Sequence, residues 1–395
     1  MFNKAYIPYR GYWSSPFCRW QGSFQNENAI ALGAAVAKSA LAERKIDPAA
    51  LDGCVLGWSV PQKHCFYGTP WYCAMMGNDR ISGPIFSQAC ATSASGVGYL
   101  AAAVETGVYG AVLVAMVDRC SNGPHLVYPN PQGPGGKPEC EDWVMDNFGH
   151  DPHAKNAMID TAEKVARRFG VTRQECDTLT MDRYAKYQAG LANDRAFQKR
   201  YMVPVTLRRG KKETVVDADE GVFATTAEGL AGLKPVVPDG VLTFGSQTHP
   251  ADGNIGIILA GRDKAEALSA DKKVTIQVLS YGYARAEKGH MAMAVVPAAE
   301  MALGAAGLAV KDLKAVKTHN PFAVNDVYMG RVMGIPEGIF NNYGSSLIFG
   351  HPQAPTGGRL IIELIEELVI LGGGTGLFSG CAAGDTAAAV VIRVG

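Results

Sequence analysis

An internal repeat constrains the fold of this chain more than any other feature. The stretches 40–51 and 302–313 carry apolar residues at the same four relative positions, which are the first, second, seventh and twelfth of each stretch. Cys90 lies 39 residues after the end of the first stretch, and His351 lies 38 residues after the end of the second. In each copy a glycine stands six places further on and precedes a helix-like run. The repeat predicts a duplicated α/β fold in which one half supplies a cysteine and the other a histidine.

Cys90 lies between a short apolar run and a predicted helix, within Phe86-Ser-Gln-Ala-Cys90-Ala-Thr-Ser-Ala-Ser-Gly96. The helical run that follows ends at Gly107. At a helix N-terminus the free N–H groups and the macrodipole favour the thiolate, which is the nucleophilic form of cysteine. A small buried core cysteine would fit the same local pattern. The repeat favours the first interpretation, a nucleophile.

Composition excludes several classes of protein. The chain has 395 residues, 47% of them hydrophobic and 19% charged, which is typical of a globular protein. Its 37 basic and 37 acidic residues argue against a nucleic-acid-binding surface. No apolar run is as long as a membrane span, and no secretory signal is visible. Nine irregularly spaced cysteines match neither a disulfide framework nor a zinc pattern, so we expect a cytoplasmic protein without metal.

A change of composition near residue 118 divides the first half. Residues 118–151 are rich in Gly, Pro and Asn and include Tyr128, Trp143 and Phe148. Such a stretch is typical of a long irregular insertion that covers a binding site or an interface. The expected organisation is an N-terminal half (1–117), a loop-and-helix insertion with the return strand of the first half near its end (118–245), and a C-terminal half (246–395) that opens on the strand 253–260.

Three further reactive side chains stand where predicted strands end or a helix begins. His319 follows an apolar strand, and His351 precedes Pro352 at a predicted helix cap. Cys381 lies in a glycine-rich hairpin between apolar strands. Strand ends usually carry the site residues of open α/β sheets. Each residue alone could be structural, but together with Cys90 they predict an active site.

These motifs resemble the thiolase superfamily over nearly the whole chain. Ser15-Pro16-Phe17-Cys-Arg19-Trp-Gln-Gly22 is similar to the family's N-terminal Thr-Pro-Phe-Gly-Arg-Phe-Gly-Gly, and Ala89–Gly96 resembles its nucleophile segment. Gly350-His351-Pro352 and Gly380-Cys381 match its C-terminal motifs in order and spacing. The resemblance implies a duplicated five-layer αβαβα fold and a Claisen-type reaction on coenzyme A thioesters.

The resemblance also implies a role for each reactive residue. Cys90 would be the acyl-accepting nucleophile and His351 its activating base. Cys381 would be the acid/base that handles the proton on the substrate α-carbon or on the thiol. His319 stands where the commonest thiolases have Asn, and either side chain could hold an ordered water at the thioester oxygen. The Ala383 N–H would complete an oxyanion hole with that of Cys90. Coenzyme A is then a co-substrate, and no cofactor is permanently bound.

Contacts with the coenzyme are less specific in the sequence. Thr248 falls where a serine near the coenzyme is common in the family. A basic run in the insertion has a solvated loop as its simplest interpretation. The resemblance adds the alternative that some of its side chains face the coenzyme phosphates. These basic candidates are Arg208, Arg209, Lys211 and Lys212.

The predicted function is thiolysis, or formation, of a 3-ketoacyl-CoA through an acyl-enzyme on Cys90. Ala157 replaces a histidine of short-chain members, and with the aromatics of the insertion it favours a bulky or aromatic acyl group in a catabolic pathway, such as that of benzoylsuccinyl-CoA. The alternatives are an acetoacetyl-CoA thiolase, a ketoacyl-synthase-like condensing enzyme, and a non-catalytic binding subunit. Cys381 argues against the synthase, and retention of all four chemical positions argues against the binding subunit.

The resemblance further implies a homodimer or a dimer of dimers. Some relatives with unusual substrates work with a small companion subunit. Residues 3–25 carry many aromatic side chains, which predicts an edge or subunit interface that could dock such a partner. These aromatics are Tyr6, Tyr9, Tyr12, Trp13, Phe17 and Trp20.

Overall fold

The structure, a computed structural model, describes residues 1–395 and repeats one sheet topology in its two halves. The first sheet contains, in order, β1 (Tyr12–Ser14), β10 (Ala251–Ala260), β5 (Ala111–Arg119), β3 (Gly53–Gly57) and β4 (Ile85–Phe86), and β2 (Cys18–Arg19) also pairs with β10. The second contains β11 (Ile276–Arg285), β14 (Thr386–Val394), β13 (Gly374–Ala382) and β12 (Ala315–His319). Phe340 bridges to β12 in the fifth place. In both sheets the first two pairings are antiparallel and the next two are parallel, which confirms the predicted duplication.

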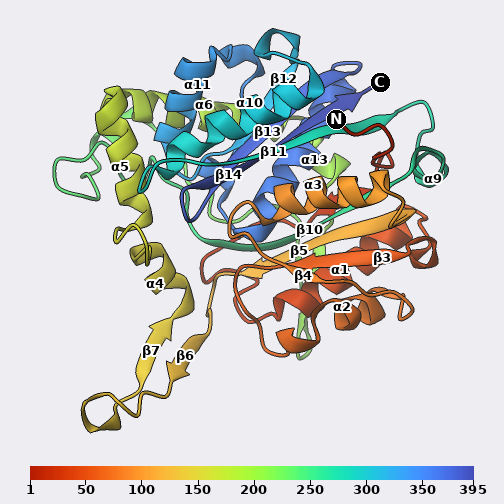
Figure 1. Cartoon of the computed structure of the whole chain (residues 1–395), viewed down its shortest axis with the longest axis horizontal. Helices are drawn as coiled ribbons and strands as arrows, with labels where there is room; N and C mark the ends of the chain where they lie inside the picture. Colours follow the sequence, from red (N-terminus) through yellow and green to blue (C-terminus); the bar gives the residue numbers. More distant parts are fainter.

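Five layers result from stacking these sheets with helices (Figure 1). The helices α3 (Thr92–Glu105) and α13 (Ala354–Ile370) lie between the two sheets and contact both. On the outer face of the first sheet lie α1 (Ala29–Glu43) and α2 (Gly68–Met76). On the outer face of the second lies α10 (Val295–Ala306), with α11 (Ala323–Met333) beside it. Each sheet therefore buries both faces, as the predicted αβαβα arrangement requires.

Charged side chains within the central layer are paired. Helix α13 is buried around its whole circumference from Ala354 to Leu368. Its Arg359 bonds Asp219 at 2.6 Å, and its Glu367 lies 3.2 Å from Lys317 of β12. Lys317 departs from the apolar pattern of the repeat, because the first copy has Val55 at the matching position. A buried lysine is tolerated here because a carboxylate of the central helix faces it.

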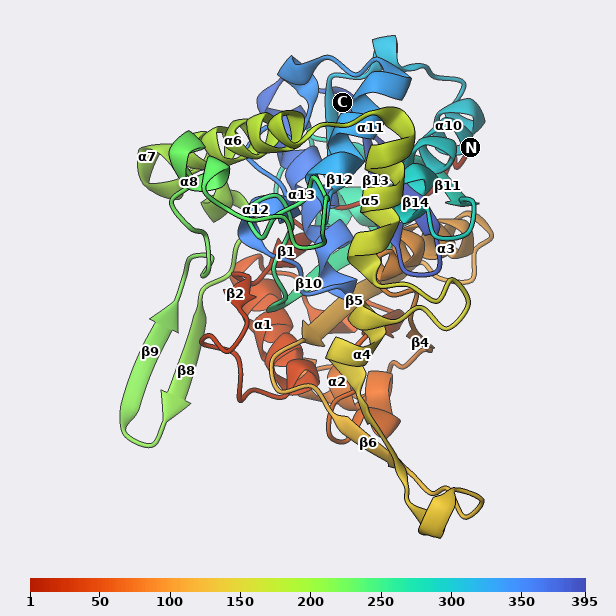
Figure 2. The same ribbon diagram turned by 90° about the vertical axis from the view of Figure 1, so that its left-hand side faces the viewer.

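The insertion between β5 and β10 forms two hairpins and a set of helices, and Figure 2 shows both hairpins extending away from the body. Part of the prediction was wrong, because the stretch after residue 118 is a hairpin and a short helix rather than irregular chain. Thr172 and Glu175 form a capping box at the start of one of the insertion's helices. The elements of the insertion are β6 (His125–Tyr128), β7 (Glu139–Asp142), α4 (Trp143–Gly149), α5 (Met158–Phe169), α6 (Arg173–Gly190), α7 (Ala192–Arg195), β8 (Val205–Arg209), β9 (Lys212–Val216) and α8 (Ala227–Ala231).

The remaining helices are short. In the second half they are α9 (Arg262–Leu268), which follows β10, and α12 (Ser346–Phe349), which precedes His351. No helix of the chain combines the length and the hydropathy that a bilayer crossing needs. The 3₁₀ turns are Pro48–Ala50, Cys65–Tyr67, Pro134–Gly136, Gln198–Arg200, Met291–Ala294, Val310–Asp312 and Glu337–Ile339.

The boundary between the halves differs from the predicted one. Strand β10 lies between β1 and β5 and pairs antiparallel with both. It is therefore the return strand of the first half, and the second half begins after Ala260 rather than at residue 246. A strand buried on both faces reads as a continuous apolar run, so its sequence does not show which sheet it joins.

Three of the six aromatic side chains of the N-terminal segment pack inside the chain. Tyr12, Trp13 and Phe17 have no exposed surface. Trp13 lies over Gly256, where an added Cβ would come within 2.1 Å of the ring, and Phe17 lies over Gly253 in the same way. The glycines of β10 make room for these rings. The predicted docking surface is therefore absent at these three positions.

Candidate active site

The connection from β4 to α3 holds Cys90 in a strained turn. Ala89 has a φ of 45°, in the left-handed region that costs a non-glycine residue about 1–3 kcal/mol. The turn is closed by the Thr92 N–H, which donates to the Ala89 carbonyl, while the Gln88 N–H donates to the Thr92 hydroxyl. The N–H groups of Cys90 and Ala383 hydrogen-bond the Cys90 sulfur and favour its charged form. Two backbone donors thus converge where an acyl oxygen on Cys90 would lie.

His351 lies beside this cysteine. Its Nε2 is 3.1 Å from the Cys90 Sγ, and its Nδ1 is 2.7 Å from the Thr356 Oγ1. Its main-chain N–H donates to the His249 carbonyl. Gly350 precedes it with a φ of 92°, and a Cβ there would lie 2.7 Å from the His249 ring. A thiol, an imidazole and a hydroxyl are therefore joined by successive contacts, the arrangement that an activated nucleophile requires.

The prediction that His351 caps the following helix was wrong, because the helix begins a few residues later in the chain. Helix α13 begins at Ala354, and its cap residue is Gln353. Gln353 adopts a φ of 58°, so a left-handed turn separates Pro352 from the helix. His351 consequently lies in a bridge with Pro250 rather than at the helix end.

The register of the second sheet brings His319 and Cys381 together. In the parallel pair β12–β13, His319 is opposite Gly380, where a Cβ would come within 2.9 Å of the histidine. Cys381 follows immediately and is 1% exposed. Its pKa is raised by burial and then by the neighbouring Cys90. Both cysteines thus belong to one site, although they come from different halves.

His319 lies behind His351 rather than in the cavity wall. The two rings stack with centroids 4.0 Å apart, and Nδ1 of His319 is 2.8 Å from the Ser346 Oγ. Its buried Nε2 has no hydrogen-bond partner in the chain. Burial lowers the pKa of His319 to about 3, so its ring is neutral. The donor atoms of Cys90, His319 and His351 all lie within 4.8 Å of one another, close enough to share a soft metal ion.

Burial changes the pKa of Cys90 more than the two backbone N–H donors do. Although Cys90 keeps some accessible surface, its surroundings raise its pKa to about 12. Burial, with His319 and His249 nearby, lowers the pKa of His351 well below its usual value. The free site therefore holds a thiol and a neutral imidazole, not the thiolate expected from the helix terminus alone. The proton must move when substrate binds.

This protonation state predicts how Cys90 reacts with iodoacetamide. Because both partners are neutral, the alkylation rate should rise with pH from about pH 6 to about pH 9 without a plateau. A thiolate–imidazolium pair would instead give a plateau that begins below about pH 7. Peptide mass spectrometry resolves Cys90 from the exposed Cys140, which serves as the internal reference.

A cavity of about 820 Å³ opens over these residues, within the range of small-molecule sites. Cys90, His351 and Cys381 line it, and so does the turn Ala383–Gly384. Thr248 lines it as well, and its hydroxyl donates to the Ser346 carbonyl at 2.5 Å. The cavity thus unites three of the four predicted chemical residues and one predicted coenzyme contact.

The insertion supplies one wall of this cavity. Trp143, Phe148 and Met158 line it, together with most of the segment between them. The Trp143 indole N–H donates to the Ser59 carbonyl at 2.9 Å, which fixes the ring against the first half. Tyr128, by contrast, is on the exposed hairpin and does not reach the cavity. Of the three aromatic side chains predicted to line the cavity, Trp143 and Phe148 do so and Tyr128 does not.

The basic run does not reach the cavity. Its side chains lie on the β8–β9 hairpin, are exposed, and contribute nothing to the cavity wall. Arg208 pairs with Glu213 across the hairpin at 3.3 Å. The simpler expectation, a solvated loop, describes this hairpin. The residues concerned are Arg208, Arg209, Lys211 and Lys212.

Several supporting residues were not foreseen from the sequence. Thr356 and Ser346 hold the two histidine rings, and Asn325 donates to the sulfur of Cys381. Asp118 accepts the N–H groups of Ser59, Val60 and Ala354, which ties the loop after β3 to the start of α13. Burial raises the pKa of Asp118 to about 7. Nothing in their local sequence marks them, and all but Thr356, which is five residues from His351, act on residues distant in the chain.

Comparison with known proteins points to one family. Models of the thiolase N-terminal domain and the thiolase C-terminal domain match residues 13–263 and 272–394. The beta-ketoadipyl-CoA thiolase of Pseudomonas knackmussii is 29% identical over 96% of this chain and 97% of its own. The acetyl-CoA acetyltransferase of Paracoccus denitrificans is 27% identical over 96% and 97%. The structure of human mitochondrial 3-ketoacyl-CoA thiolase in complex with CoA has a TM-score of 0.90 and 24% identity, covering 99% of this chain and 98% of the human one.

Proposed function

The chain belongs to the thiolase family of acyltransferases, and from that premise we propose that it cleaves or forms a 3-ketoacyl-CoA through an acyl-enzyme on Cys90. The observation that carries the proposal is the 3.1 Å contact between the Cys90 Sγ and the His351 Nε2, at a cavity that Cys381 also lines. Coenzyme A is the proposed co-substrate, as it is a ligand of the human relative.

The first half-reaction uses all four chemical residues. His351 Nε2 takes the proton of the Cys90 thiol, and the sulfur attacks the 3-keto carbon of the substrate. The bond between C2 and C3 then breaks, and its electron pair passes to C2 as an enolate. We assign to His319 the support of the thioester oxygen, through an ordered water. The Cys381 thiol gives its proton to C2, which leaves an acyl group on Cys90 and a thiolate at Cys381.

The second half-reaction restores the enzyme. The Cys381 thiolate takes the proton of the incoming coenzyme A thiol, whose sulfur attacks the acyl carbon on Cys90. The N–H groups of Cys90 and Ala383 stabilise the oxyanion that forms. Collapse of this intermediate releases the new thioester and returns the thiolate to Cys90, which recovers its proton from His351. Thr248 is placed to contact the coenzyme along the same cavity.

The same proposal extends to the acyl group, which we infer to be bulky, branched or aromatic. Its supports are the volume of the cavity and the wall formed by Trp143, Phe148 and Met158. Ala157, at the cap of α5 and next to the lining residue Met158, stands where short-chain members of the family carry a histidine. A benzoylsuccinyl-CoA is one such substrate. Acetoacetyl-CoA is the competing candidate, since aromatic side chains also serve packing alone.

This substrate class is tested by measuring kcat/KM for acetoacetyl-CoA and for an aryl-substituted 3-ketoacyl-CoA side by side. We expect the aryl substrate to be favoured at least about tenfold, a difference of about 1.4 kcal/mol in transition-state binding. Phe148→Ala should reduce the preference, whereas Tyr128→Ala, on the hairpin, should leave it unchanged. A clear preference of the wild-type protein for acetoacetyl-CoA would contradict the inference.

We also propose that the chain assembles as a homodimer or a dimer of dimers. The support is an exposed apolar face along the edge strand β4, where Ile85 is 41% exposed and Tyr99 53% exposed. Phe66, on the turn before α2, is 90% exposed. The Phe86 and Tyr99 rings meet at 5.5 Å, which extends this face onto α3.

A further inference from the structure

We propose that Asn325 is a positioning residue that holds and stabilises the thiolate of Cys381 between the two half-reactions. The inference rests on the acid/base role proposed above for Cys381. Asn325 lies in the first turn of α11 and is 1% exposed. Its side-chain Nδ2 donates a hydrogen bond to the Cys381 Sγ at 3.2 Å.

The charge on the sulfur decides how much this contact contributes. A neutral thiol is a weak acceptor, whereas a thiolate gains a charge-assisted bond from an amide N–H. Burial and the neighbouring Cys90 both disfavour the thiolate and raise the pKa of Cys381, while Asn325 lowers it. Asn325 is the one side chain that acts in this direction on Cys381. The amide therefore contributes most at the step in which Cys381 has given its proton to the substrate carbon.

The side-chain carbonyl oxygen of Asn325 argues against a purely structural role for this residue. The Asn325 Oδ1 is buried and has no hydrogen-bond partner in the chain. An unpaired buried acceptor is destabilising, because it has lost its hydrogen bonds to water without replacing them. A leucine would fill nearly the same volume without this cost. The amide is therefore better explained by its N–H groups, which face the reactive sulfur, than by its packing.

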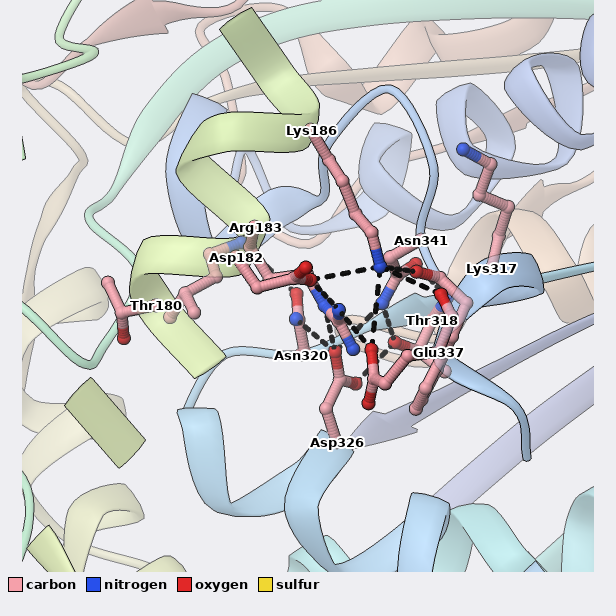
Figure 3. Close-up of polar contacts among 12 residues, drawn as sticks. Thr180, Asp182, Arg183, Lys186, Lys317, Thr318, Asn320, Asp326, Glu337 and Asn341 are labelled. Carbon is pink, nitrogen blue, oxygen red and sulfur yellow. Dashed lines mark hydrogen bonds and ion pairs between the residues drawn. The ribbon is translucent and has the colours of Figure 1, made fainter. Parts of the chain in front are cut away.

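The next residue holds the amide in place. The Asp326 carboxylate accepts four hydrogen bonds, and Figure 3 shows it below the side chains that reach it. Arg183 Nε reaches it at 2.9 Å from α6, and Thr318 Oγ1 at 2.5 Å from β12. The amides of Asn320 and Asn341 complete the set, each at 2.8 Å. The first turn of α11 is thereby fixed to the strand that ends at His319, which holds the backbone of Asn325 in place beside Cys381.

The experiment follows two reactions of acetyl-CoA. One is deuterium incorporation into its methyl group in D₂O, which requires Cys381 to move the α-proton. The other is acetylation of Cys90, observed by intact mass. In Asn325→Leu we expect the deuterium rate to fall about tenfold to hundredfold, as for a lost bond to a charged group, and its pH profile to move to higher pH. Cys90 acetylation should stay within about threefold of wild type, because the coenzyme A thiolate can leave without the proton of Cys381.

Two further variants make the result decisive. Asn325→Asp keeps the size and polarity of the side chain and places a negative charge beside the sulfur, so it should show the same selective loss. It decides the matter if Asn325→Leu does not fold. Val327→Ala, two residues along α11 and partly exposed, is the matched control and should change neither rate.

The outcomes separate this inference from the proposed function. Equal slowing of both reactions, or no loss of deuterium incorporation, would overturn the role of Asn325 while wild-type chemistry stands. Failure of wild-type Cys90 to accept an acyl group from acetyl-CoA or from any 3-ketoacyl-CoA would overturn the proposed function itself.

Discussion

Replacing Cys90 with alanine should abolish both acylation and turnover. The expected loss reaches about a millionfold, as for other enzymes that lose their nucleophile. No second thiol can substitute, because the His351 imidazole contacts the sulfur of Cys90. The sulfur of Cys381 instead accepts a hydrogen bond from the Asn325 amide. Intact mass after incubation with a 3-ketoacyl-CoA measures acylation, and release of the thioester products measures turnover.

Cys176→Ala provides the matched control for Cys90→Ala. Cys176 is also a free, buried cysteine, but it lies in α6 and does not line the cavity. Its loss should leave acylation and turnover near wild type. If Cys90→Ala retained more than about 1% of the activity, another residue would be the nucleophile.

Replacing Cys381 with serine or alanine should separate the two kinds of chemistry. Cys90 should still become acylated from a simple acyl-CoA, because His351 remains at 3.1 Å from its sulfur and the coenzyme A thiolate, unlike a carbanion, can leave without a proton from Cys381. Cleavage or formation of the carbon–carbon bond should fall by about 10²–10⁴-fold, the usual contribution of a general acid or base. Acylation is read by intact mass, and the carbon–carbon step by the appearance of the shorter thioester.

The serine and alanine variants at position 381 also test each other. Serine keeps the size of the side chain but is much the weaker acid, so both variants should show the same pattern. Equal loss of acylation and of the carbon–carbon step in both variants would show that Cys381 is structural or shares in activating Cys90. The role assigned to Asn325 would then fail too, since it acts only through this sulfur.

The fold was largely predictable because the same pattern of apolar residues recurs in the two halves of the sequence. The spacing from Leu51 to Cys90 nearly equals that from Leu313 to His351, and the two sheets indeed share one strand order. The membership of β10 was not predictable, because an apolar run does not encode which neighbours it pairs with. The N-terminal aromatics were misassigned for a related reason. The space for Trp13 is created by Gly256, more than 200 residues away in the chain.

The reactive residues of the site could be named in advance, but their chemical state could not. Cys90, His351 and Cys381 stand in short motifs, whereas the groups that orient them do not. Thr356 and Asn325 look like ordinary helix residues until the tertiary structure brings them to His351 and Cys381. The protonation of Cys90 depends on how deeply the tertiary structure buries it, because burial raises the pKa of the thiol. The local sequence shows only the helix N-terminus, which would lower that pKa.

The shared topology of the two sheets has an evolutionary consequence. A chain made of two equivalent units would begin with two equivalent sites, yet position 90 in one unit is a cysteine and the matching position 351 in the other is a histidine. Each copy has given up half of the chemistry and depends on its sister for the remainder. Neither unit can return to independence by a single substitution, because a second nucleophile at 351 would remove the only base that contacts the first. The contact between Cys90 and His351 therefore requires both units to stay joined in one chain or in one stable assembly.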